Sequence, residues 1–299
     1  MNYLLAGGSG FVGTYFAKYL TEKGHSVTIM TRSPAKYANS KTGYRYCGWG
    51  DELVEELNRT DVLVNLAGEN LFGERWNEEV KKRLVASRIE TTRKLVEGIA
   101  KAGDKPKVFV SSSAVGYYGE NGDKELPEGS PPKEDFLSNI CVAWEKESEP
   151  ATQYGVRVVN PRIGVVIEQD GGALEKMLPA FKMFVGGPLG SGKQWFPWIH
   201  MQDTIRILEF CATNESLNGP VNCVAPEPVR MSAFTTTLGK VMSRPSFFPV
   251  PEFVLSVVVG EAASDIVASQ RVIPKVLSDA GFEWLYPDAF SALKDVMSR

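Results

Sequence analysis

The stretch Ala6-Gly7-Gly8-Ser9-Gly10-Phe11-Val12-Gly13 decides the fold of this 299-residue chain. It follows the apolar run Tyr3-Leu4-Leu5 and opens a segment with helical periodicity, so it joins a predicted strand to a predicted helix. In that context the spacing is typical of dinucleotide binding, because glycines permit a tight turn and let the backbone approach a pyrophosphate at the helix N-terminus. An ordinary glycine turn is the alternative to the cofactor contacts that we expect from Gly7, Gly10, Phe11, Val12 and Gly13.

The residues after the second predicted strand indicate which dinucleotide is bound. That strand covers residues 26–30 and ends at Thr31-Arg32-Ser33, where an NAD site usually has Asp or Glu for the ribose 2′-hydroxyl. A guanidinium suits a 2′-phosphate, whereas a carboxylate would repel it. We therefore interpret Arg32 as selecting NADP(H), with Thr31 as a hydroxyl donor. A solvated charge at a strand end is the alternative for Arg32.

The first half of the chain alternates predicted strands and helices, which indicates a parallel sheet with helices on both faces. We expect an α/β fold, a doubly wound Rossmann sheet over residues 1–166, with a smaller, irregular substrate lobe over residues 167–299. Residues 199–225 of that lobe are expected to pack back on the sheet. The glycine turn, Arg32, the end of the fourth strand and a serine run all follow predicted strands, so they share one edge of the sheet. The fourth strand ends in Leu66, Ala67 and Gly68.

Composition limits the classes of partner. A net charge of −3 gives no reason to expect nucleic acid or an anionic membrane. The apolar run over residues 253–259 is too short to span a bilayer and predicts one buried helix. Four scattered cysteines and two histidines form no metal-ligand spacing, so no metal is expected. Because the first strand begins near residue 3, we expect no signal peptide and a cytoplasmic protein; the oligomeric state stays open.

Motifs along nearly the whole chain resemble the extended short-chain dehydrogenase/reductase superfamily, in its atypical epimerase-family branch with a distinctive C-terminal module. In that superfamily a serine after the fifth strand and a Tyr-x-x-x-Lys dyad in the next helix transfer protons. This chain keeps the serine, as Ser113, but has Cys141 and Glu145 at the dyad positions. The motifs that carry the resemblance are residues 7–13, Asn65-Leu66-Ala67-Gly68-Glu69, Arg75-Trp76, Ser87-Arg88, Ser113-Ala114-Val115-Gly116-Tyr117-Tyr118-Gly119, Trp144-Glu145, residues 186–192, Trp198-Ile199-His200, Gln270-Arg271-Val272 and Gly281-Phe282.

An enzyme without the dyad needs another proton donor, since positioned acid–base catalysis contributes roughly 10²–10⁴-fold to the rate. Tyr117 and Tyr118 are the nearest phenols to Ser113, although packing against the cofactor is the favoured explanation for both. Glu69, just after the fourth strand, is a further possible base or substrate contact, with a surface carboxylate as its alternative.

Two arginines and two residues of the second half complete the candidate site. Arg88 belongs to a strongly basic helix that is by default a solvated face, but it matches the family pattern and is expected to contact a phosphate. Arg162 matches a family position near the nicotinamide; a buried arginine paired with a carboxylate is the alternative. Trp198 and His200 follow a glycine-rich loop and are expected to face the substrate, while a structural histidine bonded to the backbone is equally compatible with the sequence.

These observations leave two functional classes open. One is an NADP(H)-dependent oxidoreductase, or a redox-initiated epimerase, that acts on a small polar molecule. The other is a cofactor-binding sensor or scaffold that no longer turns over. An intact phosphate site beside a missing dyad is compatible with both.

Overall fold

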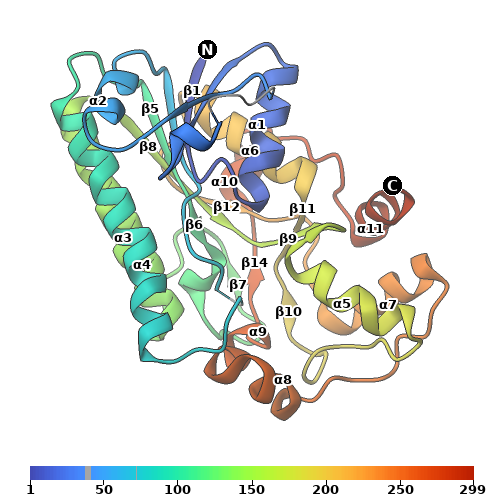
Figure 1. Ribbon diagram of the computed structural model, residues 1–299. Helices are drawn as coiled ribbons and strands as arrows, with labels where there is room; N and C mark the ends of the chain where they lie inside the picture. The colour runs from blue at the N-terminus through green and yellow to red at the C-terminus, as the bar shows by residue number, and fades with distance from the viewer. Residues whose placement is uncertain (38–41, 72) are drawn as a thin grey trace.

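A parallel sheet forms the centre of the structure (Figure 1). The structure is a computed structural model that describes residues 1–37, 42–71 and 73–299. In this part of the chain the main sheet has eight strands in the order β12-β8-β5-β4-β1-β2-β3, with β6 also paired to β8, and every pairing is parallel. The predicted Rossmann fold is thereby confirmed. The strands are β1 (Asn2–Ala6), β2 (Ser26–Met30), β3 (Arg45–Cys47), β4 (Val62–Asn65), β5 (Val108–Ser111), β6 (Ser113–Ala114), β8 (Arg157–Ile163) and β12 (Gly219–Cys223).

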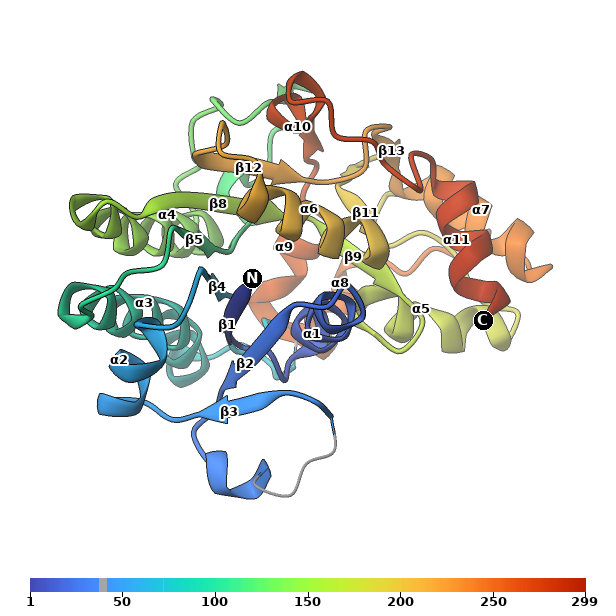
Figure 2. The same cartoon turned by 90° about the horizontal axis from the view of Figure 1, so that it is seen from above.

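Helices cover both faces of this sheet, as Figure 2 shows from above. Successive side chains of a strand point to opposite faces, so Leu4 packs on the side of α2 and α3, whereas Tyr3 and Leu5 pack on the side of α1 and α6. The first side holds α2 (Asp51–Leu57), α3 (Glu78–Lys101) and α4 (Phe136–Ser148), and the second holds α1 (Phe11–Glu22) and α6 (Met201–Thr213). Short 3₁₀ turns are η1 (Pro34–Tyr37), η2 (Val115–Tyr118) and η3 (Glu149–Tyr154).

A second core lies beside the sheet, around the fully buried side chains of Ile167, Phe181, Trp198 and Phe234. Between Trp198 and Phe234 the chain returns to the main sheet. There α6 covers one face of the sheet and β12 pairs with β8. The boundary at residue 166 stays a prediction. The remaining elements are β7 (Glu125–Leu126), β9 (Val165–Glu168), α5 (Gly172–Lys182), β10 (Trp195–Phe196), β11 (Trp198–His200), β13 (Val229–Arg230), α7 (Met231–Met242), α8 (Glu252–Val259), η4 (Gly260–Ala262), α9 (Ala263–Ile266), β14 (Arg271–Val272), α10 (Lys275–Asp279) and α11 (Ala289–Ser298).

The apolar run of residues 253–259 forms α8, but the prediction that this helix is buried was wrong. Phe253 and Val257 are 70% and 71% exposed. The reason is the position of α8 at the periphery, where it packs against η4 and α9 at the lower edge of the molecule (Figure 1). No helix within the described residues has the length and apolar character needed to cross a bilayer.

Candidate cofactor and active site

The glycine turn after β1 has the shape of a phosphate cradle. Gly7 has a φ of +79°, and a Cβ there would lie 2.6 Å from the backbone nitrogen of Ala67. A Cβ at Gly13 would lie 2.2 Å from the carbonyl oxygen of Gly7. Gly10 caps α1 without any side-chain hydrogen bond, and the first turn of α1 contains no acidic residue. The helix N-terminus is therefore open to an anion, as pyrophosphate binding requires.

The ends of two neighbouring strands lie beside this cradle. The backbone N–H of Leu66 donates to the carbonyl of Ala6 over 2.8 Å, and the N–H of Ala67 donates to the Asn65 side chain over 3.1 Å. These bonds hold the loop after β4 against Gly7. On the other side β2 runs parallel to β1 with Met30 opposite Ala6, so Thr31 and Arg32 emerge next to the glycine turn.

Arg32 is exposed and forms no ion pair with any described residue. The Thr31 hydroxyl accepts a hydrogen bond of 3.2 Å from the N–H of Ser33, which fixes the start of the loop. The guanidinium is thus available to a ligand at the edge where the 2′-phosphate was expected. Its contact with a cofactor stays a prediction.

Phe11 links the glycine turn to the second core. A Cβ at Gly171 would lie 2.5 Å from the Phe11 ring, and one at Gly172 would lie 3.2 Å from it. The ring thus packs on the backbone at the start of α5. Val12 is half-buried and packs against the core on the α1 side of the sheet. The sequence contained no signal for the packing of Phe11 on Gly171.

Three consecutive serines, from the last residue of β5 to the first residue of β6, have buried hydroxyl groups. The Oγ atoms of Ser111, Ser112 and Ser113 accept or donate no hydrogen bond of normal geometry among the described residues, although the Ser113 hydroxyl lies close enough to the Cys141 thiol to lower its pKa. Ser113 lies at the predicted strand edge, in register with Arg162, but only 2% of it is exposed. Unpartnered buried hydroxyls are uncommon in folded proteins, so this edge fits a polar ligand that supplies the missing partners.

An ion pair occupies the place of the expected dyad. Glu145 accepts hydrogen bonds from Nε and Nη2 of Arg162, both of 2.8 Å. Cys141 is buried, and burial together with the nearby Glu145 charge raises the pKa of its thiol to about 11. Neither Cys141 nor Glu145 is suited to the proton transfer that a tyrosine–lysine pair performs. Arg162 is a buried arginine paired with a carboxylate, which was the alternative to its expected position near the nicotinamide.

The two tyrosines of η2 have different environments. Tyr118 is fully buried; its hydroxyl donates to the Asn222 side chain over 2.7 Å and accepts from Arg162 over 2.9 Å. Burial raises the pKa of Tyr118 to about 12, so its proposed catalytic role does not fit this environment. Tyr117 is only half-buried, and its ring lies 3.4 Å from the Arg162 guanidinium carbon. No described residue bonds its hydroxyl, so Tyr117 is the better placed phenol.

Glu69 and Arg88 lie together after β4. The Glu69 carboxylate pairs with Arg83 over 3.2 Å, and the N–H of Glu69 donates to the Ser87 hydroxyl. The default expectation for Arg88, a solvated helix face, was wrong, because only 8% of this residue is exposed. Its guanidinium donates to the carbonyl oxygens of Glu69 and Leu84 over 3.0 and 3.1 Å.

Trp198 and His200 lie in the interior and do not face an open crevice. His200 is fully buried, and its Nδ1 accepts a hydrogen bond from the N–H of Gln202, which caps α6. Its Nε2 is 3.2 Å from Asp295, and burial lowers its pKa to about 4 although Asp295 opposes the shift. Trp198 belongs to the second core beside Phe234. The structural alternative is therefore the better description of His200, and a substrate contact by either residue stays untested.

Comparison with known proteins places these features in a family. Residues 3–223 match the NAD dependent epimerase/dehydratase family, and residues 250–296 match a domain of unknown function, DUF1731. The chain belongs to the NAD-dependent epimerase/dehydratase family. The resemblance noted in the sequence is thereby confirmed.

Two relatives match this member of the family over its whole length. Epimerase family protein YfhF of Bacillus subtilis is 38% identical over 300 residues, which cover 100% of this chain and 98% of the relative. The crystal structure of human epimerase family protein SDR39U1 with NADPH has a TM-score of 0.90 and 36% identity, covering 100% of this chain and 99% of that one. A nucleoside-diphosphate sugar epimerase from Corynebacterium glutamicum has a TM-score of 0.75 and 31% identity, covering 98% of this chain and 57% of that one.

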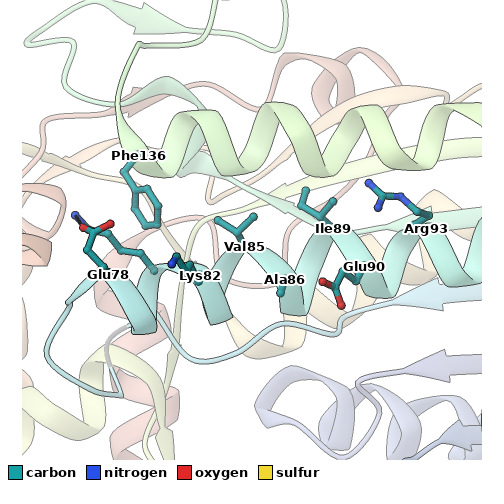
Figure 3. Close-up of a pocket in the computed structure, with 9 residues that line it drawn as sticks. Glu78, Lys82, Val85, Ala86, Ile89, Glu90, Arg93 and Phe136 are labelled. Atoms are coloured by element: carbon teal, nitrogen blue, oxygen red, sulfur yellow. Dashed lines mark ion pairs between the residues drawn. The ribbon is translucent and has the colours of Figure 1, made fainter.

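A separate hollow of about 660 Å³ lies between α3 and α4 (Figure 3). Its floor includes Val85 and Ile89, which lie one residue beyond the buried positions Leu84 and Arg88 of α3. Because a helix turns by about 100° per residue, the hollow opens on a different face from the one that carries Arg88. This epimerase-family chain therefore has its candidate site at the strand ends and not in this hollow.

Proposed function

We propose that the chain binds NADP(H) across the carboxyl ends of β2, β1, β4 and β5. The supporting observation is the glycine cradle, in which a side chain at Gly7 or Gly13 would collide with the backbone and α1 begins without a cap. NADPH in the solved structure of human SDR39U1 supports the same cofactor. The residues proposed to line the site are Gly7, Gly10, Phe11, Val12, Gly13, Thr31, Arg32, Leu66, Ala67, Gly68, Arg88 and Arg162.

The unpaired Arg32 supports a preference for the 2′-phosphate form. A guanidinium forms strong, directional hydrogen bonds with phosphate oxygens. Arg32 has no acidic partner among the described residues from which it would have to be released. The open N-terminus of α1 supports a second anionic group, the pyrophosphate, one strand away.

For the reaction we propose hydride transfer, as an oxidoreductase or a redox-initiated epimerase, on a small polar molecule. The bound nicotinamide would supply the hydride chemistry, and the chain would orient the substrate and move the proton. Ser113 and Tyr117 are the proposed donors: Ser113 has an unfilled hydroxyl at the strand edge, and the Tyr117 ring is held against Arg162.

One observation favours a second candidate, an NADP(H)-binding sensor without turnover. The dyad positions hold Glu145, which is paired with Arg162, and the buried Cys141, whose thiol pKa is raised to about 11 by burial. A protein with the phosphate cradle and these residues at the dyad positions would bind the cofactor but would have no dyad tyrosinate to transfer a proton.

Oxidation of NADPH over a panel of carbonyl compounds and nucleotide sugars separates the two candidates. We expect saturable NADPH binding and weak or absent turnover on ordinary superfamily substrates. Fast turnover that both Ser113→Ala and Tyr117→Phe abolish, while the exposed control Tyr154→Phe does not, supports the enzyme. Absent turnover with NADPH still bound supports the sensor. Failure of the parent protein to bind NADPH contradicts the proposal itself.

A further inference from the structure

Arg88 carries a buried positive charge that forms no ion pair with a described carboxylate, although the Glu69 carboxylate, itself paired with Arg83, favours the charged form. Its described partners are the carbonyl oxygens of Leu84 and Glu69 and, at 3.5 Å, the Ser87 hydroxyl. Burial lowers the pKa of Arg88, although an arginine stays charged at neutral pH. Arg162, the other buried arginine of the site, has Glu145 as its counter-ion. A buried cation without such a partner is costly, so an anionic ligand is the missing component.

The Arg88 guanidinium packs against the loop after β4. A Cβ at Gly68 would lie 3.1 Å from Cζ, 3.2 Å from Nη2 and 3.3 Å from Nε of Arg88, over the face of the guanidinium, so glycine at this position permits the close packing. No described residue accepts a hydrogen bond from Nε. Within the same protein, the corresponding edge of Arg162 holds both oxygens of the Glu145 carboxylate. Nη2 of Arg88 already donates to the Glu69 carbonyl, so the Nε N–H is the donor left for an anionic ligand.

The charge of Arg88 lies next to the dyad position. The Arg88 guanidinium carbon is 5.3 Å from the centre of the Trp144 ring on α4. Its charge also lowers the pKa of the Cys141 thiol, against the larger raising effect of burial. The cation of this centre therefore comes from α3, whereas the superfamily pattern takes it from α4. Ser113, the first residue of β6, and Arg88 both act on the Cys141 thiol, so the Ser113 hydroxyl adds a neutral donor near the Arg88 charge.

A buried hydrogen-bond network fixes the turn of α3 that carries Arg88. The Thr92 hydroxyl donates to the Arg88 carbonyl over 2.8 Å. It accepts hydrogen bonds from the Asn65 amide over 2.8 Å and from the Trp144 indole over 3.0 Å. β4, α3 and α4 are thereby joined at one point, which fixes the turn of α3 from which the Arg88 side chain extends.

We propose that Arg88 binds a carboxylate of the substrate at the ends of β4 and β5, so that the substrate is a small carboxylic acid. This inference rests on the proposed function, in which the cofactor's own anions lie elsewhere: the 2′-phosphate at Arg32 after β2 and the pyrophosphate at α1 after β1. Arg88 lies beside Gly68, which follows β4. Because neighbouring strands are about 4.8 Å apart, an anion bound by Arg88 would lie farther along the sheet than the pyrophosphate at β1 and the 2′-phosphate at β2.

The test is a titration of the NADPH-saturated protein with pyruvate, followed by saturation-transfer NMR, with the uncharged pyruvamide as the matched ligand control. Arg88→Met removes the charge at similar length, and Arg88→Lys keeps the charge but not the planar edge. Arg93→Met is the matched control variant, because Arg93 lies on the same helix in an exposed pair with Glu147. The NADPH affinity of every variant is measured first on the same samples.

We expect pyruvate to bind the parent and Arg93→Met proteins, pyruvamide not to compete, and Arg88→Met to bind pyruvate at least about tenfold more weakly. Arg88→Lys should bind with intermediate affinity. The melting temperature of Arg88→Met should stay unchanged or rise, since an apolar residue replaces an unpaired buried charge. If Arg88→Met does not fold, Arg88→Lys carries the comparison.

Equal pyruvate binding by the parent and the Arg88 variants overturns the inference, as does absence of pyruvate binding to the parent holo-protein. A loss of NADPH affinity in Arg88→Met as large as that in Arg32→Ala also overturns it, because Arg88 would then hold a cofactor phosphate. If the parent binds no NADPH, the proposed function fails, and pyruvate binding to the cofactor-free protein tests Arg88 by itself.

Discussion

The carboxylate of Glu145 accepts two hydrogen bonds of 2.8 Å from Arg162 across the gap between α4 and β8. Their side chains are only 14% and 3% exposed. The position that carries the catalytic lysine in the wider superfamily therefore holds an acid that is already neutralised. The same guanidinium lies 3.4 Å from the centre of the Tyr117 ring and 5.1 Å from that of the Tyr118 ring.

Glu145→Ala should lower the free energy of unfolding by about 3–5 kcal/mol, because it leaves the Arg162 charge buried without a partner. Urea denaturation of Glu145→Ala, Arg162→Met and the double variant measures the coupling between them. We expect the double variant to lose less stability than the sum of the single variants. Additive losses would show that the pair is not a unit.

Tyr118→Phe and Tyr117→Phe should differ in stability despite the same chemical change. The first leaves the buried Asn222 oxygen and one Arg162 N–H without a partner, at a cost of about 1–3 kcal/mol. The second removes a hydroxyl that bonds no described residue and should cost less than about 0.5 kcal/mol. Chemical denaturation decides the matter, and equal losses would contradict the assigned environments.

Stability should fall as the pH decreases from 6.5 toward 4, because burial holds the pKa of His200 near 4, below its ordinary value of 6.5. In that window the unfolded chain binds a proton that the folded chain excludes, so the contribution is complete above pH 6.5 and lost below pH 4. Its size is on the order of 3 kcal/mol. Asp295 attracts and Arg299 repels the proton.

The matching variant is His200→Asn, which retains a residue able to cap α6 but cannot titrate. We expect the pH dependence of its unfolding free energy to be flatter between pH 4 and 6.5 than that of the parent. An unchanged slope in His200→Asn would place the titrating group elsewhere.

Gly13→Ala should disrupt the junction of β1 and α1, because its Cβ would lie 2.2 Å from the Gly7 carbonyl oxygen and 2.7 Å from the Gly8 Cα. Overpacking of this kind costs about 1–3 kcal/mol or more, and the shifted helix should no longer bind NADPH. Gly129→Ala is the control, since no atom lies within 4 Å of its added Cβ. Thermal unfolding and NADPH titration of both variants check this expectation.

The parts of the structure that local patterns determine were accessible from the sequence. The spacing of Gly7, Gly10 and Gly13 predicted the turn, and the apolar runs before it and before Arg32 predicted parallel strands that end at one edge. These features depend on neighbours within a few residues. The family resemblance likewise rested on contiguous motifs.

The contacts that determine the burial and charge pairing of the site residues are long-range, and no spacing in the sequence predicts them. Asn222 reaches Tyr118 across 104 positions of the chain, and Asp295 reaches His200 from the last helix. Arg88 was expected to contact a phosphate although it stands among other basic residues of α3, but its place on the buried stripe of that helix could not be predicted from charge alone. α8 was predicted to be buried because its residues are apolar. Composition does not show whether another element covers the helix.

The most direct test of the account is the ratio of NADPH to NADH affinity in the parent, Arg32→Ala and Arg59→Ala proteins. Arg59 is an exposed arginine that precedes β4, at the opposite end of the strands, and serves as the control. We predict that the parent and Arg59→Ala proteins prefer NADPH, and that Arg32→Ala weakens NADPH binding by about 1.5–3 kcal/mol while NADH binding is unchanged. Equal affinity of the parent for the two cofactors, or an Arg32→Ala protein that keeps the preference, would contradict the account.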